Sequence, residues 1–157
     1  MSKNIIIFCA VCLLLSMVSV NTAQAESRTA LPNDFGIELL GKAVLYSFSY
    51  QRMVTPFLGL QAGLGALGGS DNLVAFAPLG GKVYVIPKDG SPFITGGIVI
   101  LTDSADTDII DSTTYGYAGL GFEYRLPGGF LFRASAYGLF TEGDYFIWPG
   151  LHIGYAF

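Results

Sequence analysis

Large apolar residues recur at every second position along most of the chain, and the residues between them are small or polar. The C-terminus shows this most clearly, because Leu151, Ile153, Tyr155 and Phe157 alternate with glycine, alanine and histidine. Such alternation is typical of β-strands, whose successive side chains point to opposite faces of the sheet. It predicts eight strands, over residues 35–40, 43–52, 57–66, 73–86, 93–102, 113–126, 130–140 and 145–157.

The two faces of these strands differ in an unusual way. A sheet with one face in water would carry charged side chains on that face, whereas here the second face is rich in glycine, alanine and serine. An apolar face directed outward into lipid, with small and polar residues inside, explains this composition. We therefore expect Leu60, Phe122 and Ile153 to point away from the barrel axis.

The connections between the strands predict how they pair. A turn at Pro127-Gly128-Gly129 would place Glu123 opposite Arg133. A turn centred on Val54 would place Ser49 opposite Gly59 and Ser47 opposite Gln61. We also expect a short reversal at Gly41-Lys42, and a break or bulge in the fourth strand at Pro78 and Gly80-Gly81.

An even number of alternating strands predicts an all-β fold, an eight-stranded antiparallel up-and-down transmembrane β-barrel over residues 35–157. Most connections alternate between short turns and longer polar loops, as expected if both termini lie in the periplasm. Residues 26–34 are polar and contain Pro32, so we expect a flexible lead-in there.

Residues 1–25 have the pattern of a cleaved secretory signal peptide. Lys3 supplies the positive start, an apolar run follows, and Ala23-Gln24-Ala25 is a small-residue cleavage site. The apolar run is short for a membrane-spanning helix, which needs roughly 20 apolar residues. Both cysteines, Cys9 and Cys12, lie inside this segment. The chain after the cleavage site therefore has no thiol for a disulfide or a metal site.

Composition and charge narrow the possible functions. Hydrophobic residues make up 52% of the chain and charged residues only 13%. That is apolar for a soluble domain, but it suits a barrel whose lipid-facing residues are spread along alternating strands. The 12 acidic residues outnumber the 8 basic ones, which argues against a nucleic-acid partner.

The alternating strands, the signal peptide, the loop pattern and the terminal Tyr155-Ala156-Phe157 together resemble the small eight-stranded outer-membrane barrels of the OmpA/OmpX type. The resemblance covers the chain after the signal peptide. It implies that Leu151, Ile153, Tyr155 and Phe157 form the C-terminal signal that the barrel assembly machinery reads. The family includes anchors, adhesion proteins and lipid-modifying enzymes, so the resemblance alone implies no activity.

Charged residues at inward positions are the first candidates for a site. Glu123 and Arg133 should form an ion pair inside the barrel, because a charge buried there is costly unless it is paired. The parity of the strands adds further inward charges to this predicted luminal network, namely Glu38, Lys82 and Arg125. Two interpretations stay open: the network is the polar core of the barrel, or it forms a gate or narrow ion pathway.

His152, the only histidine, is the one weak candidate for catalysis. It points inward, and closure of the barrel would bring it near Glu38, which could make it a general base. The alternative is an interior histidine with its hydrogen bonds satisfied. One histidine with scattered carboxylates lacks the clustering that metal ligands need, so we expect no metal and no cofactor.

The outward aromatic residues should form two interfacial girdles, as in other membrane barrels. One would hold Tyr46, Tyr50, Tyr124, Phe132, Tyr155 and Phe157, and the other Tyr115, Phe140, Tyr145, Phe146 and Trp148. The alternative interpretation makes these rings the core of a soluble barrel.

The sequence as a whole predicts a monomeric, non-enzymatic protein of the outer membrane with a filled interior and a structural or surface-interaction role. Its partners would be outer-membrane lipids or lipopolysaccharide, and the assembly machinery during biogenesis. Three alternatives stay open: a lipid A deacylase or acyltransferase, a small-solute pore, and a soluble periplasmic barrel similar to lipocalins.

Overall fold

The computed structural model describes residues 26–68, 73–103, 111–141 and 143–157. The predicted signal peptide over 1–25 lies outside the described residues. In chain order the elements are α2 (Glu26–Ala30), β1 (Asn33–Leu40), η2 (Gly41–Ala43), β2 (Tyr46–Met53), β3 (Leu58–Gly68), β4 (Leu73–Tyr84), β5 (Gly90–Asp103), β6 (Asp111–Arg125), β7 (Phe130–Phe140) and β8 (Tyr145–Ala156). None of the described helices is long and apolar enough to cross a membrane.

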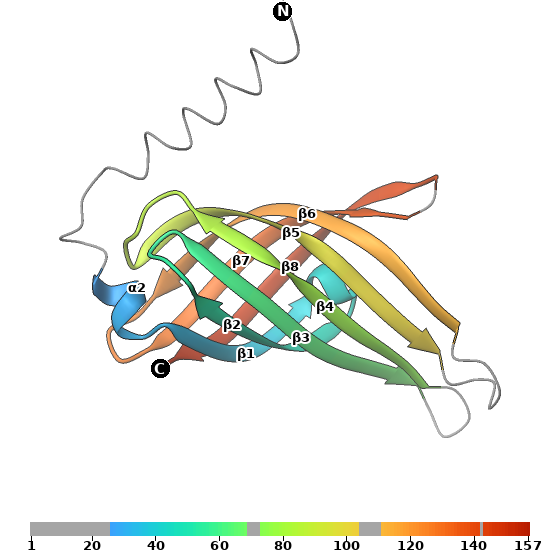
Figure 1. Ribbon diagram of the computed structural model, residues 1–157, viewed down its shortest axis with the longest axis horizontal. Helices are drawn as coiled ribbons and strands as arrows, with labels where there is room; N and C mark the ends of the chain where they lie inside the picture. Colours follow the sequence, from blue (N-terminus) through green and yellow to red (C-terminus); the bar gives the residue numbers. More distant parts are fainter. Residues whose placement is uncertain (1–25, 69–72, 104–110, 142) are drawn as a thin grey trace, which may run out of the picture.

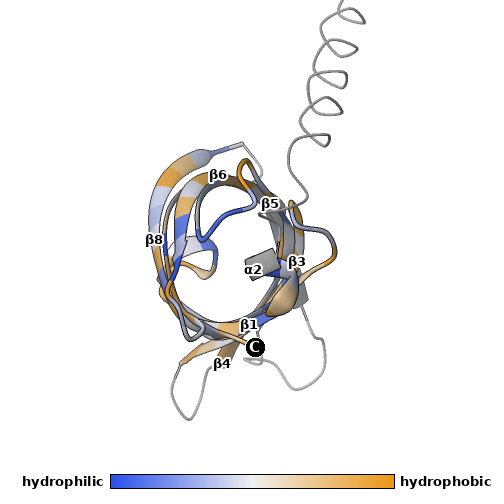
Figure 2. Cartoon of the chain, turned by 90° about the vertical axis from the view of Figure 1, so that its left-hand side faces the viewer, coloured by the Kyte–Doolittle hydropathy of each residue, from blue (hydrophilic) through white to orange (hydrophobic). Residues whose placement is uncertain are grey.

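The strands form one closed barrel in sequence order, β1 to β8, with every neighbouring pair antiparallel (Figures 1 and 2). β1 closes the ring by pairing with β8, from Asp34 opposite Ala156 to Leu40 opposite Gly150. The main chains of Asn33 and Phe157 exchange two further hydrogen bonds, of 3.0 and 2.8 Å, beside this seam. The predicted eight-stranded up-and-down fold is confirmed.

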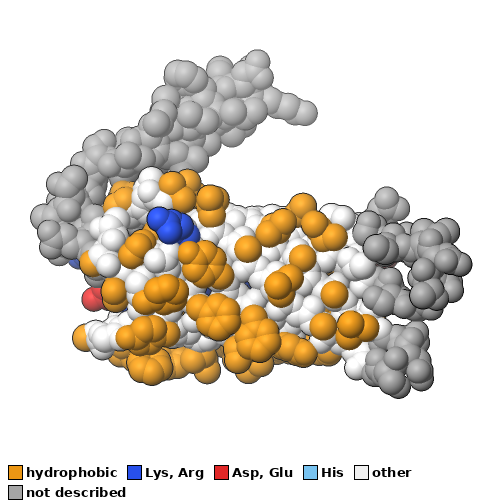
Figure 3. All heavy atoms as spheres, turned by 60° about the horizontal axis from the view of Figure 1, so that its bottom comes forward, with side chains coloured by type: hydrophobic (Ala, Val, Ile, Leu, Met, Phe, Trp, Pro, Cys, Tyr) orange, Lys and Arg blue, Asp and Glu red, His pale blue; other side chains and the backbone are white. Residues whose placement is uncertain are grey.

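Side chains alternate between the two faces of the wall as the sequence predicts. Along β2, Phe48 and Tyr50 are exposed on the outside, whereas the side chains of Ser49 and Gln51 are buried in the lumen. The three residues expected to point outward do so: Leu60, Phe122 and Ile153 are 55, 51 and 55% exposed. Figure 3 shows the result on one face of the barrel, where hydrophobic side chains spread over the outer wall.

The connection between β1 and β2 differs from the prediction. The expected second strand starts at residue 43, but β2 begins at Tyr46 because Gly41–Ala43 form a buried 3-10 turn. Leu40 and Val44 flank this turn with φ of 59° and 69°, a conformation that is unfavourable for residues with a side chain. Luminal contacts hold it, since Tyr115 Oη donates a hydrogen bond of 2.5 Å to the Lys42 carbonyl.

Tyr115 therefore does not belong to the outer girdle where the sequence analysis placed it. Its ring is buried in the lumen with Val99, Tyr117 and Leu139. Trp148 is also drawn inward, and its indole Nε1 donates to the Val44 carbonyl at 2.9 Å. The inward fold of η2 supplies the polar backbone groups that bind both aromatic side chains.

The register between β2 and β3 also corrects a prediction. Ser49 lies opposite Gly63 and Gln51 opposite Gln61, instead of Ser49 opposite Gly59. The connection takes four residues, 54–57, because the Thr55 hydroxyl accepts the backbone N–H groups of Phe57 and Leu58 at 3.2 and 2.9 Å. The slip is an even number of residues, so the face that each side chain occupies is unchanged.

The predicted break or bulge in β4 takes a mild form. Pairing between β3 and β4 lapses between Ala62, opposite Leu79, and Gly65, opposite Phe76. The register is the same on both sides of the gap, so no extra residue is inserted and there is no bulge. Pro78 lies in the gap and lacks the N–H group that the ladder would need.

Candidate functional site

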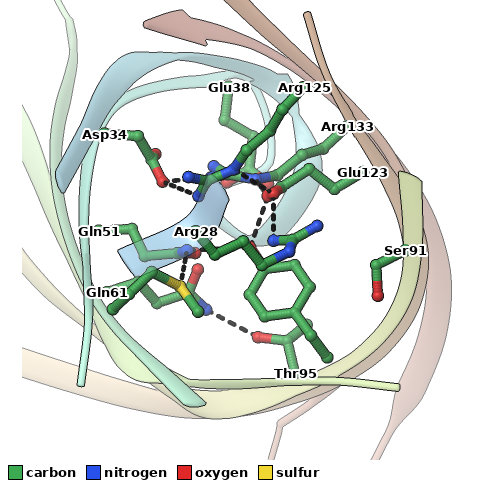
Figure 4. A network of polar contacts seen from close by, with 12 residues as sticks. Arg28, Asp34, Glu38, Gln51, Gln61, Ser91, Thr95, Glu123, Arg125 and Arg133 are labelled. Carbon is green, nitrogen blue, oxygen red and sulfur yellow. Dashed lines mark hydrogen bonds and ion pairs between the residues drawn. The ribbon is translucent and has the colours of Figure 1, made fainter. Parts of the chain in front are cut away.

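The strongest candidate site in the described chain is a cluster of buried charges inside the barrel, near the end that holds α2 (Figure 4). At its centre is Glu123 of β6, opposite Arg133 of β7, in the register expected from the turn that follows β6. That turn is closed by the Leu126 N–H, which donates to the Phe130 carbonyl at 2.7 Å. The turn therefore fixes which charges face each other in the lumen.

Four side chains donate hydrogen bonds to the Glu123 carboxylate. Arg28 Nη1 and Arg125 Nε bind Oε1 at 2.6 and 2.8 Å. Arg133 Nε and Tyr84 Oη bind Oε2, the tyrosine at 2.5 Å. Hydrogen bonds to ionised groups are the stronger class, so this carboxylate is held by three cations and one neutral donor.

Asp34 of β1 is the second acid of this cluster. Its Oδ2 accepts Arg133 Nη2 at 2.6 Å and Arg125 Nη2 at 3.4 Å. The two arginines therefore bridge Asp34 and Glu123 across the lumen. We name the buried group formed by these five charged residues the lower cluster: Arg28, Asp34, Glu123, Arg125 and Arg133.

Arg28 lies in the segment 26–34, for which the sequence predicts a flexible lead-in. It belongs to the short helix α2, and its side chain is fully buried in the barrel. Its guanidinium lies 3.9 Å from the centre of the Tyr84 ring, and its Nε donates to the Lys88 carbonyl at 2.9 Å. An arginine from this segment therefore completes the shell around Glu123.

Glu38 lies in a separate group, which we name the upper cluster: Glu38, Lys42 and Tyr137. Lys42 Nζ forms an ion pair with Glu38 Oε2, and Tyr137 Oη donates to Oε1 at 2.6 Å. Across the described residues no hydrogen bond or ion pair links this group to the lower cluster. The residues of the predicted luminal network therefore do not form one connected group among the described residues. Lys42, which was predicted only to be part of a short reversal, is the cation that Glu38 binds.

Lys82 does not join either cluster. It is buried, and within the described part of the chain it forms no ion pair. Its Nζ lies over two aromatic rings instead, 4.5 Å from the centre of Phe93 and 5.9 Å from that of Tyr84. Cation–π contacts are the attraction that remains for an ammonium group placed in this way.

The described lumen carries excess positive charge. Its buried side chains include five cations, Arg28, Lys42, Lys82, Arg125 and Arg133, and three carboxylates, Asp34, Glu38 and Glu123. Uncharged polar groups lie beside these charges: Gln61 Nε2 donates to Thr95 Oγ1 at 2.7 Å and to Tyr117 Oη at 2.9 Å. The described interior thus combines buried charged and polar side chains with a cluster of buried apolar ones that includes Phe76, Val99 and Leu139.

His152 lies opposite Glu38 on β1 and opposite Arg133 on β7, so closure brings it beside Glu38 as expected. Its ring is buried, and Nε2 has no hydrogen-bond partner among the described residues. A general base needs a hydrogen bond to the group that it activates. No such pair involving His152 occurs in the described residues, and its side chain faces the lumen. The described residues also contain no group of side chains that could hold a metal ion.

The four residues of the predicted C-terminal signal share the outer face of the last strand. Leu151, Ile153, Tyr155 and Phe157 are all exposed. The Tyr155 ring contacts Phe130 of β7 edge-on, with 5.4 Å between the ring centres. These side chains form an apolar stripe along the seam where β8 meets β1.

The comparisons with known proteins support the architecture. No family model matches the chain, and no curated protein matches it. Among solved structures, the fold is similar to the N-terminal β-barrel domain of OprF from Pseudomonas aeruginosa, with a TM-score of 0.58 and 17% identity over 80% of this chain and 94% of that one. It is also similar to the de novo designed protein TMB2.3, with a TM-score of 0.53 and 13% identity over 79% of this chain and 91% of that one.

Proposed function

We propose that this protein is an integral outer-membrane β-barrel with a filled lumen, and that it acts as a non-enzymatic anchor or surface-interaction protein. The observation that carries the proposal is the inverted polarity of the wall. Large apolar side chains cover the outside, and five cations with three carboxylates are buried inside. An apolar surface of this extent is unstable in water and is typical of a wall that contacts lipid.

The filled interior supports an anchor rather than a solute pore. An eight-stranded barrel is just wide enough for its own side chains to fill it. Here the lumen is occupied by the lower cluster, by Gln61 with its partners Thr95 and Tyr117, and by the inward η2 turn. Planar-bilayer recordings should show no steady conductance, and a stable open channel in the wild-type protein would refute this part of the proposal.

A lipid hydrolase or acyltransferase built on His152 is not favoured by the geometry. Its imidazole is buried on the luminal face, away from the surface that would meet lipid substrates. Incubation of the purified protein with labelled lipid A and phospholipid, beside His152→Ala, tests this directly. We expect no hydrolysis or acyl transfer by either protein, and turnover that disappears in His152→Ala would establish the enzyme.

Localisation has its own test. Sodium carbonate extraction should leave the protein in the membrane pellet, and the folded barrel should run faster on an unboiled SDS gel than on a boiled one. We expect the monomer to be inserted by the barrel assembly machinery through the stripe of Leu151, Ile153, Tyr155 and Phe157. Release of the chain by carbonate would support the soluble, lipocalin-like alternative.

A further inference from the structure

A groove opens on the outer wall of the barrel across β1 to β4. Its volume is about 370 Å³, within the range of roughly 300–1,000 Å³ that is common for small-molecule sites. The residues that line it are Phe35, Phe48, Tyr50, Ala62, Gly63, Leu64, Ala77 and Leu79. They belong to four neighbouring strands, so the groove crosses the wall rather than following one strand.

Small residues line the middle of the groove, between larger ones. Ala62 and Ala77 lie on the outward face of β3 and β4 beside Gly63, and Tyr50, Leu64 and Leu79 flank them. Pairing between the two strands lapses at the same place, next to Pro78. Short side chains and a local gap in the ladder therefore coincide at this depression in the wall.

The sides of the groove are apolar. Phe35 and Phe48 stack with their ring planes 6° apart and their centres 6.2 Å apart, and they form one side. Leu64 and Leu79 form the other side, and both are exposed. A chain of methylene groups can make dispersion contacts with such walls, whereas a polar ligand would find little to bind.

A polar group lies at one end of the same face. Arg52 follows Tyr50 by two residues on β2, so its side chain points to the same side about 7 Å further along the strand. It is exposed and forms no ion pair with any described residue, and its Nη1 reaches Asn33 Oδ1 at 3.4 Å. Asn33 Oδ1 also accepts the Tyr50 hydroxyl at 2.7 Å. Figure 3 shows basic side-chain atoms among hydrophobic ones toward the left-hand end, where Figure 1 places α2.

Arg52 lies on the same outer face as the groove, two residues beyond its lining residue Tyr50, and an apolar groove beside such an arginine suits a ligand with an apolar chain and an anionic head. We propose that the groove binds one acyl chain of a glycerophospholipid whose phosphate is held by Arg52. Arginine is well suited to this because its planar guanidinium binds phosphate oxygens through two parallel hydrogen bonds. The inference rests on the proposed membrane location. The arginine lies at the barrel end that holds α2 and Phe157, so the lipid comes from the leaflet at that end.

The test uses the full-length protein purified from membranes in a mild detergent. Native mass spectrometry then measures the occupancy of added dioleoyl phosphatidylglycerol on the wild type and three variants. Ala62→Leu/Ala77→Leu fills the groove, and Arg52→Gln removes the cation. Ala134→Leu makes the same type of change once, at an outward alanine of β7 outside the groove. The apparent affinity should fall about tenfold in the groove variant and in Arg52→Gln, and stay unchanged in Ala134→Leu.

A photoactivatable acyl chain gives a second readout. Its crosslinks should fall on β3 and β4 in the wild type and be lost in Ala62→Leu/Ala77→Leu. Equal occupancy in all four proteins, or crosslinks scattered around the barrel, would overturn the proposal. Preferential binding of lipopolysaccharide over phospholipid would overturn the assigned ligand.

Folding of each variant is checked by heat-modifiable gel mobility. If the groove variant does not fold, Arg52→Gln decides, since its surface position leaves the fold intact. Carbonate extraction distinguishes a failure of the groove proposal from a failure of the proposed membrane location. A protein retained in the membrane without a specific lipid contradicts only the groove, whereas a protein released by carbonate contradicts the membrane location itself.

Discussion

Replacing Glu123 by glutamine hardly changes the side-chain volume. Among substitutions of this kind in the barrel, it should cause one of the largest losses of stability. The carboxylate accepts hydrogen bonds from Arg28, Arg125, Arg133 and Tyr84. Glutamine keeps the shape but removes the charge, and it turns an N–H₂ group toward guanidinium donors. The excess of buried positive charge would rise by one at the same time.

The expected loss of unfolding free energy can be bounded from these contacts. Hydrogen bonds to charged groups contribute about 1.5–3 kcal/mol each. Three times this contribution, for the three arginine contacts, is an upper limit on the loss of unfolding free energy. The arginines keep part of their partners, because Arg125 and Arg133 still bind Asp34, and Arg28 still binds the Lys88 carbonyl. Breaking a buried ion pair from one side costs about 3–5 kcal/mol, which is the loss that we expect.

Urea unfolding in lipid vesicles, followed by heat-modifiable gel mobility, measures this loss. Asp144→Asn is the matched control, because Asp144 is exposed in a loop and should change stability by less than about 0.5 kcal/mol. The double variant Arg28→Gln/Glu123→Gln should lose less unfolding free energy than the two single variants lose together, by about 1 kcal/mol or more. A Glu123→Gln variant as stable as the control would refute the lower cluster.

Three further predictions test other parts of the structure. Tyr84→Phe should lose about 1–3 kcal/mol in the same urea assay, because the hydroxyl also accepts Gln51 Nε2 at 2.9 Å, whereas Tyr124→Phe on the outer face should be neutral. Gly97→Ala should cost about 1–3 kcal/mol or prevent refolding, since a Cβ there would lie 2.1 Å from the Leu79 carbonyl oxygen. Gly116→Ala is its control, because a Cβ at that glycine meets no atom within 4 Å; equal stability of the two would contradict the packing. Arg28→Gln should expose the α2 segment to added protease, and unchanged cleavage would show that α2 is not fixed by its arginine.

Much of the fold could be predicted because the side-chain period of a strand fixes the face of each residue. The outward positions of Leu60, Phe122 and Ile153 follow from parity alone and needed no knowledge of the loops. The predicted faces were also correct although the predicted turn at Val54 was wrong, because an even slip of register leaves each side chain on its face. The opposition of Glu123 and Arg133 followed from a tight Gly-Gly turn with few alternatives.

The rest of the site depends on segments whose side chains lack the two-residue alternation of a strand or whose turns the sequence does not reveal. Asp34 could have been found, since it shares the inward parity of Glu38 and a surplus of inward arginines needs another acid. Arg28 could not, because its position depends on how a short helix enters the lumen. Lys42 was not predicted as a luminal charge, because the positive φ angles around Gly41–Ala43 leave no mark in the hydrophobic pattern.

The central claim is that the apolar face of the wall contacts hydrocarbon and the charged face is enclosed. Single-cysteine variants test it most directly, since both native cysteines, Cys9 and Cys12, precede residue 26. A fluorophore attached at Leu60→Cys, Phe122→Cys or Ile153→Cys should be quenched in vesicles by lipids that carry a spin label on the acyl chain. Water-soluble quenchers should have little effect on it. Efficient quenching from water and none from the acyl chains at these three positions would contradict the account.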